Sequence, residues 1–430
     1  MATERFYEEP ARRIPVSAEP DVLVAGSGPA GIAAAVAAAR AGADTMLIEQ
    51  NGVPGGISTS GLMSHWTGTA DSRLYREILE RSAALNEGEY HNRVDKYIDP
   101  EKLKTLYLAM LREAGVKLRL YTFASAAVMD GHRLRGVITE SKSGREAIFP
   151  RVVVDATGDG DVAAKAGAAF RLGREEDGRM QPATLMFKVA GVDYARAVFP
   201  GSFETRVQTE KGELQALAAL HLPHPAGHVL LYRSTLPGIV TCNMTNVTDI
   251  DGTRAEDLTR AECVCREQMW AILDYLREYV PGFEHCYIIS SASLMGVRET
   301  RHFAGLYTLT EEDILAARQF PDWVVRGAHF NFDVHNLTGA GLDPTGSQAH
   351  FTQAQGYDIP YGCLVPEKTD GLLLAGRCIS GTHLAHSNFR VMPICAALGE
   401  AAGTAAALAA GSGVEPRALP VGEIQKKLLG

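Results

Sequence analysis

The chain has 430 residues, 46% of them hydrophobic and 22% charged, and a formal net charge of -9 at pH 7. These values predict a folded globular protein of about two or three domains, and the acidic balance argues against nucleic acid or an anionic membrane as the main partner. The seven cysteines follow no repeating pattern, which indicates reduced thiols and no metal centre. No apolar run reaches the length of about 18 residues that predicts a membrane span, and residues 1–20 contain no secretion signal, so we expect a cytoplasmic protein.

Residues 21–50 are typical of a nucleotide-binding unit, in which a buried strand runs through a glycine turn into a helix and a second strand follows. Gly26 permits the tight turn, Gly28 lets the backbone approach a pyrophosphate, and Gly31 lets the helix pack closely on the strand. The first helical turn leaves backbone N–H groups unpaired, and such groups attract an anion. The stretch therefore predicts a dinucleotide site.

Two further pairs of residues complete this unit. Pro29 and Ala30 open the helix, and proline suits the first helical turn because it has no N–H group to leave unpaired. Glu49, followed by Gln50, ends the second strand at the place where an acid accepts hydrogen bonds from an adenosine ribose. This acid indicates that the dinucleotide carries an unmodified ribose.

A long loop follows over residues 51–68, and its small residues show neither helical nor strand periodicity. Loops of this length inside a compact protein are usually functional, and this one contains His65 among polar side chains. Residues 71–115 then predict a helical segment, whose second helix has Asp99 as its N-cap and Gly115 as its stop.

Residues 116–156 change to a period of two with two turn signals, which predicts a strand, a β-meander that contains Ala127, and a buried strand at 152–154. The run from Asp155 to Asp161 then repeats the order of strand, glycine turn and helix. Because this run is not a second complete nucleotide fingerprint, we expect it to lie against the same cofactor.

Short runs of β-branched and aromatic residues over 181–354 predict a largely antiparallel sheet, which one helix over 255–280 interrupts. Arg298, Glu299 and Arg301 form a dense charge group that either binds an oxygen of a substrate or cofactor or forms a buried ion-pair cluster. We interpret the Gly- and Asn-rich region that follows as a lid or pocket rim. Its histidines are His329, His335 and His350.

The α/β pattern returns in residues 355–430, where a buried strand at 372–374 runs into Gly376 and Arg377. An irregular polar segment over 382–394 follows this strand. The last long helix is so rich in alanine and glycine that we expect a neighbour to pack tightly against it.

Five stretches together resemble the FAD-dependent oxidoreductase family of the glutathione-reductase-type flavoproteins: GSGPAGIAAAVAAAR, PGGISTSGL, DATGDGDVAAKAG, GVRETRHFAGLYTLTEED and LLLAGRCISGTHLAHSNFRVMPICAALGEAAGTAAALA. The resemblance implies an α/β fold with an FAD-binding Rossmann domain, made of a parallel sheet and a β-meander, and an inserted α+β substrate domain. We predict residues 1–180 and 355–430 as the two parts of the FAD-binding domain and residues 181–354 as the substrate domain.

The resemblance also implies FAD as the cofactor and a set of residues that contact it. Near the flavin, the segment from Arg390 to Met392 would meet the pyrimidine end, where a helix N-terminus stabilises the negative charge of the reduced ring. The whole predicted set is Gly26, Gly28, Pro29, Ala30, Gly31, Glu49, Gln50, Gly55, Gly56, Ser58, Ala127, Gly158, Asp159, Gly376, Arg377, Arg390, Val391 and Met392.

Two sequence features of disulfide reductases in this superfamily are missing. The loop after Gly55 and Gly56 has no redox cysteine pair, and the chain has no second fingerprint for NADPH. We therefore expect electrons to pass directly between a small-molecule substrate and the flavin, with a separate electron acceptor such as oxygen, a quinone or a redox protein. The sequence leaves open whether the chain forms a homo-oligomer.

We predict a dehydrogenase or oxidase that transfers a hydride from a CH–OH or CH–NH group to flavin N5, with a histidine as base. The candidate bases are His383, His386 and His65, each of which also suits a structural role or a covalent flavin link. An alternative is a C=C reductase or desaturase in which Arg298 or Tyr361 donates the proton, although core packing also suits Tyr361. A third hypothesis is a non-catalytic flavin-binding protein or a component of an RNA-modifying assembly.

Overall fold

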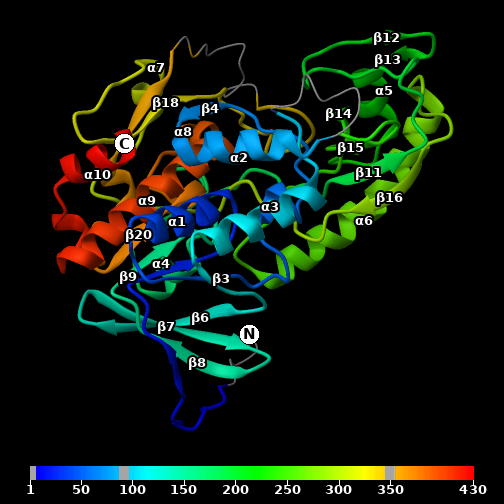
Figure 1. Cartoon of the computed structure of the whole chain (residues 1–430). Coiled ribbons are helices and arrows are strands. Elements are labelled where there is room, and N and C mark those ends of the chain that lie inside the picture. The colour runs from blue at the N-terminus through cyan, green and yellow to red at the C-terminus, as the bar shows by residue number, and fades with distance from the viewer. Residues whose placement is uncertain (1–5, 87–95, 344–352, 354) are drawn as a thin grey trace.

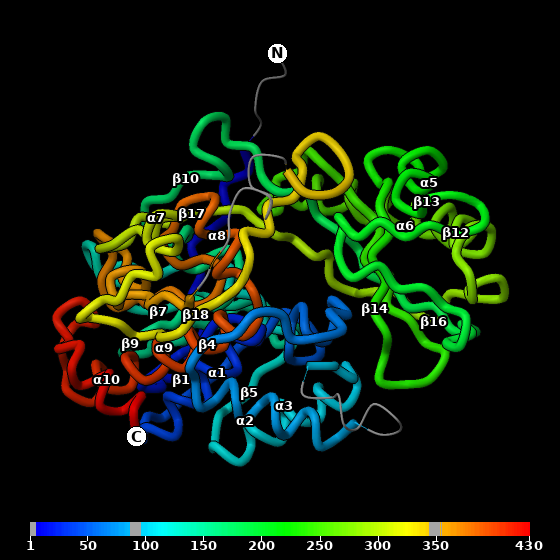
Figure 2. The backbone as a smooth tube through the Cα atoms, turned by 90° about the horizontal axis from the view of Figure 1, so that it is seen from above, coloured from blue at the N-terminus to red at the C-terminus, as the bar shows by residue number. Residues whose placement is uncertain are grey.

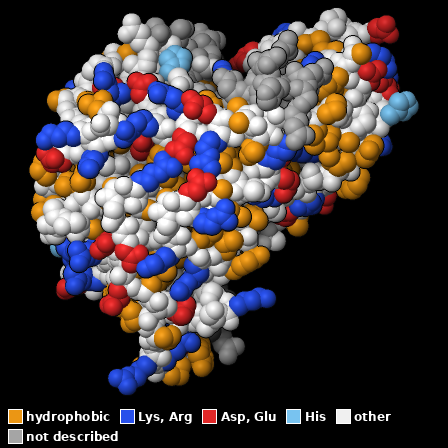
Figure 3. All heavy atoms as spheres, viewed as in Figure 1, with side chains coloured by type: hydrophobic (Ala, Val, Ile, Leu, Met, Phe, Trp, Pro, Cys, Tyr) orange, Lys and Arg blue, Asp and Glu red, His pale blue; other side chains and the backbone are white. Residues whose placement is uncertain are grey.

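The structure of this chain, a computed structural model, describes residues 6–86, 96–343, 353 and 355–430. It has two lobes, each with its own hydrophobic core (Figure 1). On the face that Figure 3 shows, lysine and arginine side chains are interspersed with aspartate and glutamate, so this face carries no extended patch of one sign. His350, which the sequence places in a lid or pocket rim, lies outside the described residues.

A five-stranded parallel sheet forms the centre of the first lobe. Its strands, in order across the sheet, are β20 (Leu372–Leu374), β9 (Val152–Asp155), β2 (Val22–Ala25), β3 (Thr45–Ile48) and β5 (Lys117–Arg119). The register sets Ala25 opposite both Ile48 and Asp155, so the carboxyl ends of neighbouring strands meet at one edge. Nucleotides bind at this edge in open α/β sheets.

Two helices of this lobe pack closely on each other beside the sheet (Figure 1): α1 (Pro29–Arg40) and α9 (Met392–Ser412). A Cβ atom added at Gly403 would lie 2.0 Å from the carbonyl oxygen of Ala34, and one added at Gly399 would lie 2.0 Å from that of Ala30. Glycine is therefore required at both positions, and the expected tight packing against the last long helix is confirmed.

The same helix α9 is long and apolar enough to cross a membrane by length and composition alone. However, 89% of its most apolar window is buried within the fold. This burial is that of a core helix, and the neighbour that covers it is α1.

The predicted β-meander lies on the far side of the parallel sheet from α1 (Figure 1). It consists of β6 (Phe123–Asp130), β7 (Arg133–Ser141) and β8 (Gly144–Ile148), and β1 (Val16–Ala18) extends it by pairing parallel to β8. The other helices of this lobe include α2 (Arg73–Ala84), α3 (Pro100–Glu113), α4 (Asp161–Lys165) and α10 (Val421–Leu429). Asp99 caps α3 as predicted, because its carboxylate accepts the N–H of Glu101 at 3.0 Å.

A four-stranded antiparallel sheet and one long helix form the second lobe, which Figure 2 shows at one side of the molecule. In sheet order the strands are β14 (Leu231–Arg233), β15 (Val240–Cys242), β11 (Phe187–Ala190) and β16 (Tyr287–Ser291). The helix α6 (Ala255–Tyr279) spans the stretch predicted as one long helix, and its buried side chains share a core with this sheet. The smaller elements are β12 (Gln208–Thr209), β13 (Gly212–Glu213) and α5 (Leu214–His221).

The boundary predicted at residue 354 lies too far along the chain. Side chains from Phe303 onward, including Val325 and Phe332, pack in the core of the first lobe, whereas the last side chain that packs on the second core is that of Met295. The residue pattern did not reveal where the chain returns to the first lobe, because a short strand shows the same alternation of apolar and polar residues in either core. The strands concerned are β17 (Arg301–Phe303), paired with β10 (Phe170–Leu172), and β18 (Trp323–His329), between β4 (Thr69–Asp71) and β19 (Tyr357–Pro360).

The segment over 382–394 was predicted to be irregular, and this prediction is wrong, because it contains the short helix α8 (His383–Phe389) and the first turn of α9. Thr382 caps α8, and its hydroxyl accepts the N–H of Ala385 at 3.2 Å. The polar side chains of the segment hid a helix that is almost wholly buried. A helix N-terminus at Met392, the first residue of α9, was expected and is present.

Candidate functional site

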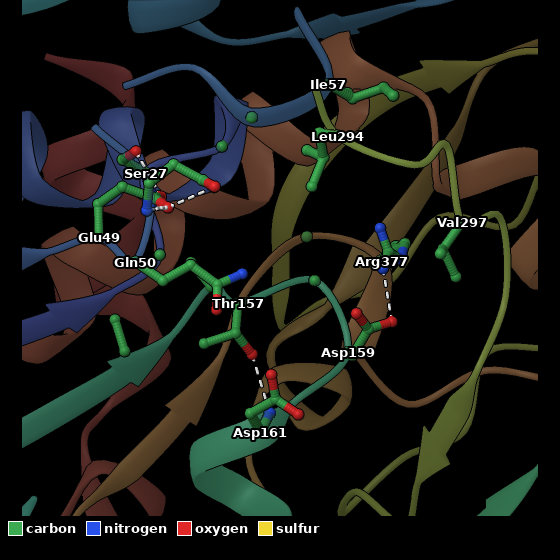
Figure 4. Close-up of a pocket in the computed structure, with 18 of the residues that line it drawn as sticks. Ser27, Glu49, Gln50, Ile57, Thr157, Asp159, Asp161, Leu294, Val297 and Arg377 are labelled. Carbon is green, nitrogen blue, oxygen red and sulfur yellow. Dashed lines mark hydrogen bonds and ion pairs between the residues drawn. The ribbon is translucent and has the colours of Figure 1, made fainter. Parts of the chain in front are cut away.

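A cavity of about 540 Å³, here called the main cavity, opens at the carboxyl edge of the parallel sheet. This volume lies in the range of about 300 to 1,000 Å³ that is typical of ligand sites. Figure 4 shows Ser27, Glu49 and Gln50 on one side of the cavity, and Asp159 and Arg377 on another. The second lobe also contributes to the wall, through Leu258 and Thr259 of α6.

The N-terminus of α1 forms one wall of the main cavity. Gly28 is its N-cap residue and has no side chain to satisfy the first N–H groups, and a Cβ atom at this position would meet no atom within 4 Å. Gly26 has a φ of +91°, a left-handed conformation that glycine adopts without strain. A Cβ atom at Gly31 would lie 1.8 Å from the carbonyl oxygen of Gly26, so this glycine allows the close contact between helix and strand. The arrangement leaves an open anion site at the helix N-terminus.

Glu49 lies beside this helix N-terminus and is 5% exposed. Its Oε2 accepts the backbone N–H and the hydroxyl of Ser27 at 2.8 and 2.6 Å, and its Oε1 accepts the backbone and side-chain N–H groups of Asn51 at 2.7 and 2.8 Å. Four donors occupy the lone pairs of a carboxylate. A ribose hydroxyl would therefore bind Glu49 in exchange for a donor such as the Ser27 hydroxyl.

Two arginines line the main cavity with unused donors. Arg377 pairs with Asp159 through Nη2 and Oδ1 at 2.5 Å, and Thr300 donates its hydroxyl to the same Oδ1 at 2.7 Å. The Nε of Arg377 is buried and has no hydrogen-bond partner among the described residues, and the same holds for the Nε of Arg390. Buried N–H groups without partners cost free energy, so both positions fit the oxygens of an anionic cofactor.

Most of the predicted cofactor residues line the main cavity. They are Gly26, Gly28, Pro29, Ala30, Glu49, Gln50, Gly56, Gly158, Asp159, Gly376, Arg377, Arg390 and Met392. The residues that do not line it are Gly31, Gly55, Ser58, Ala127 and Val391. For Ser58 the reason is burial, since its hydroxyl donates to the carbonyl of Gly55 at 2.7 Å, and Ala127 lies in the meander opposite Val137.

The sequence analysis missed several wall residues, namely Ser27, Ile57, Thr157, Leu258, Thr259, Leu294 and Val297. Ser27 and Thr157 lie in the glycine turns that follow β2 and β9, and this position in the sequence could have indicated that they line the cofactor site. The residues from α6 and from the stretch after β16 gave no such signal, because only the packing of the two lobes brings them to the cavity.

The predicted base His383 forms a buried pair with Glu299. Its Nδ1 lies 2.6 Å from Oε1 of Glu299, and Nε2 of His302 lies 2.7 Å from the same oxygen. Burial alone would raise the pKa of Glu299, but the hydrogen bonds from His302 and His383 hold that pKa well below its usual range. Burial alone would lower the pKa of His383, and the bond to Glu299 outweighs it, so the pKa lies above the ordinary value.

The other predicted histidines are the buried His386 and the half-buried His65, and both are uncharged near neutral pH. Burial holds the pKa of His386 well below its ordinary value; its ring packs on His302 at 5.0 Å, and its Nδ1 has no partner within the described chain. Burial, together with the charge of Lys96, lowers the pKa of His65 to about 4, and its ring packs edge-on against Tyr232 at 4.5 Å.

Tyr361 packs in the hydrophobic core, which favours the core-packing alternative over the role of proton donor. It is 4% exposed, and its hydroxyl donates to the carbonyl of Pro416 at 3.0 Å. Neither Tyr361 nor Arg298, nor any of the predicted bases, lines the main cavity. The predicted role of Tyr361 as a proton donor is therefore not supported by its position.

The two arginines of the charge group over residues 298–301 have different neighbours. Arg301 donates to the carbonyl of Asp159 at 2.8 Å and pairs with Asp161 at 2.9 Å, which is the structural ion-pair alternative. Arg298 instead points its Nη1 to the carbonyl of Pro182 at 2.5 Å and is 8% exposed. Arg298 and Arg301, three positions apart in the sequence, therefore contact different parts of the molecule.

Arg298 belongs to a polar group between the lobes, here called the interlobe polar cluster, in which three side chains are buried and three are half-buried. Within it, Asp333 accepts from Nη2 of Arg390 at 2.9 Å and lies 3.4 Å from Nε2 of His335. Its members are His228, Tyr232, Arg298, Asp333, His335 and Arg390, from four separate segments of the chain. His335, predicted in a lid or pocket rim, is thus buried, and Asp333 and Tyr232 were not foreseen.

Comparisons with known proteins agree with this geometry. A family profile described as FAD dependent oxidoreductase matches residues 21–428. Digeranylgeranylglycerophospholipid reductases 2 and 1 of Methanopyrus kandleri are 34% and 33% identical over 147 residues, which is 32% of this chain. The aligned part spans only 37% and 39% of the length of these relatives.

Solved structures are similar over nearly the whole chain. The flavin-dependent brominase Bmp2 has a TM-score of 0.50 and 12% identity over 95% of this chain and 82% of its own. A geranylgeranyl bacteriochlorophyll reductase-like protein from Thermoplasma acidophilum has a TM-score of 0.46 and 13% identity over 96% of this chain and 83% of its own. The likeness to the brominase concerns the fold alone.

Proposed function

Because this chain belongs to the FAD-dependent oxidoreductase family, we propose that it oxidises a CH–OH or CH–NH group of a small polar substrate held where the two lobes meet. The observation that carries the proposal is the buried pair of His383 and Glu299, whose oxygen and nitrogen lie 2.6 Å apart. We also propose the finer assignment to glutathione-reductase-type flavoproteins, with the second lobe as an inserted substrate domain.

The chain's own residues fit FAD. Gly26 and Gly28 leave room for the diphosphate at the N-terminus of α1, Glu49 suits the adenosine ribose, and Arg377 and Arg390 offer unpaired donors. FAD, when bound, supplies the hydride acceptor or donor. Hydride chemistry needs the protein to hold the substrate carbon and to take up the proton of its hydroxyl or amine.

His383 is suited to hold that proton. Its Nδ1 is occupied by Glu299, which leaves Nε2 as the atom that accepts a proton. His383 does not itself line the main cavity, but its helix α8 connects the stretch that carries Gly376 and Arg377 with Arg390, and these three residues do line it. We propose that substrate binding brings the reacting group within reach of Nε2.

The test is an anaerobic spectroscopic screen of the FAD-loaded protein. Alcohols and amines are mixed with the oxidised enzyme, and we expect at least one class to bleach the flavin absorbance. If no alcohol or amine bleaches it, and enones reoxidise the photoreduced enzyme, the enzyme is a C=C reductase and the proposal is wrong. Substrates that bleach the flavin also allow the acceptors oxygen, quinone and redox protein to be compared.

The C=C reductase is the second candidate, because the two curated relatives are named as reductases. The sequence predicted Arg298 or Tyr361 as the proton donor of such an enzyme. Arg298 is the one that remains, since Tyr361 lies in the core. Burial and the nearby charge of Arg390 lower the pKa of Arg298 to about 10, which makes it a better donor than an exposed arginine. The relatives align over about a third of this chain, so this support covers only a part of it.

We predict that Gly28→Ala folds normally but binds FAD at least about tenfold more weakly, a loss of about 1.4 kcal/mol. The new methyl group would meet no protein atom within 4 Å, and it would occupy the place where a diphosphate approaches the backbone. The ratio of flavin to protein absorbance and a titration of the apoprotein with FAD measure the effect. Gly422→Ala in α10, which also has open space around its Cβ position, is the control. Unchanged FAD affinity in Gly28→Ala would contradict the prediction.

A further inference from the structure

The interlobe polar cluster contains more positive than negative charge. Two guanidinium groups, Arg298 and Arg390, face a single carboxylate among the described residues of the cluster, that of Asp333. Asp333 is already engaged, because it accepts from Nη2 of Arg390 at 2.9 Å and lies 3.4 Å from His335. Arg298 has no carboxylate partner within 4.0 Å among the described residues, and the bond from its Nη1 to Pro182 is to a neutral carbonyl.

The other titratable members of the cluster do not restore the balance. Burial lowers the pKa of His228 to about 3 and that of His335 to about 4, so both rings are neutral at pH 7. Burial raises the pKa of Tyr232 well above its ordinary value and that of Cys265, close by, to about 11, so neither provides an anion. The cluster thus retains about one uncompensated positive charge near neutral pH.

An uncompensated buried cation is costly, and the described residues offer no further anion to offset it. The Nε of Arg390 is also buried without a partner among the described residues, so unused donors accompany the unused charge. Guanidinium donors match the two oxygens of a carboxylate in geometry as well as in charge. The cluster is therefore complementary to an anion that the described part of the chain does not supply.

The cofactor accounts for only part of this excess. Arg390 lines the main cavity and is available to FAD, but Arg298 does not line it. Arg298 lies instead on the side of the second lobe, near Tyr232 and His228, while its neighbour Val297 lines the cavity. A second molecule held by Arg298 would thus lie next to the cofactor.

We infer that Arg298, with the positive charge of Arg390 behind it, binds the carboxylate of an anionic substrate in the interlobe polar cluster. The inference rests on the proposed function, because it names the substrate class of the same site: a small hydroxy or amino acid rather than a neutral alcohol or amine. Arg298 is the specificity-determining residue, and His383 serves the reacting group.

Binding measurements on the FAD-loaded protein test this inference without turnover. Acetate and benzoate, with acetamide and benzamide as matched neutral probes, are titrated by calorimetry and by flavin difference spectra. We expect an acid to bind at least about tenfold more tightly than its amide. Arg298→Gln should weaken binding of the acid by about 10- to 100-fold, the effect of losing a hydrogen bond to a charged group, and leave the amide unchanged.

Arg298→Lys and Arg206→Gln complete the set of variants. The lysine variant keeps the charge and should recover part of the affinity, which separates loss of charge from a disturbed fold. Arg206 is 79% exposed in the second lobe, and its substitution should change nothing. Equal binding of acids and amides, no binding of either acid, or full acid affinity in Arg298→Gln would each overturn the inference.

The outcomes also separate the inference from the proposed function. If acids bind through Arg298 but no alcohol or amine bleaches the flavin, the inference stands and the proposed function fails. If neutral alcohols bleach the flavin as readily as hydroxy acids, the proposed function stands and the inference fails. A change in FAD spectrum or content in Arg298→Gln without a change in acid binding would assign this arginine to the cofactor, against the inference.

Discussion

Replacing His383 with glutamine is expected to slow substrate-dependent flavin reduction by about 10²- to 10⁴-fold, the range that a general base contributes. Glutamine keeps the size and a donor toward Glu299 but cannot accept a proton at the position of Nε2. FAD content should be unchanged, because His383 does not line the main cavity. Anaerobic stopped-flow absorbance measures the rate, and His132→Gln, at an exposed position, is the control. A rate within about twofold of wild type would exclude His383 as the base.

The same pair predicts how the rate depends on pH. A base must be deprotonated, so the rate should rise with pH through the pKa of His383, which lies above the ordinary value of about 6.5 because the bond to Glu299 outweighs burial. In Glu299→Gln the charge that raises this pKa is removed while burial remains. The rising limb should therefore move to lower pH, whereas a merely structural role for Glu299 would lower the rate without moving the limb.

The second large effect concerns stability. Gly403→Val should lower the free energy of unfolding by about 3 kcal/mol, the upper part of the usual range for overpacking. The added Cβ would lie 2.0 Å from the backbone oxygen of Ala34, and a backbone atom cannot move aside as a side chain can. α1 and α9 would have to separate, and both are almost wholly buried.

Urea unfolding followed by circular dichroism measures this change. Gly411→Ala lies in the same helix, and its Cβ would meet no atom within 4 Å, so it should be neutral or stabilising by up to about 1 kcal/mol. If both variants unfold at the wild-type midpoint, the close contact between α1 and α9 does not exist in solution.

The sequence alone determined the nucleotide-binding half of this protein. Gly26, Gly28 and Glu49 lie within one short stretch, where strand, turn and helix follow from local conformational preferences, so their roles could be read without knowledge of the rest of the chain. The high alanine and glycine content of the last long helix likewise predicted a close neighbour, because small side chains allow two helices to approach each other closely.

Only the tertiary structure decided the arrangement around the substrate. Glu299 meets His383 across 84 positions of sequence, and Arg298, Asp333 and Arg390 meet between two lobes. Tyr361 and His386 have the composition of site residues, but packing places Tyr361 against Pro416 and buries His386 beside His302. Local patterns record which residues can form a strand, a helix or a turn. They do not record which side chains meet when separate segments close into one core, and the charge balance of the interlobe polar cluster depends on that closure.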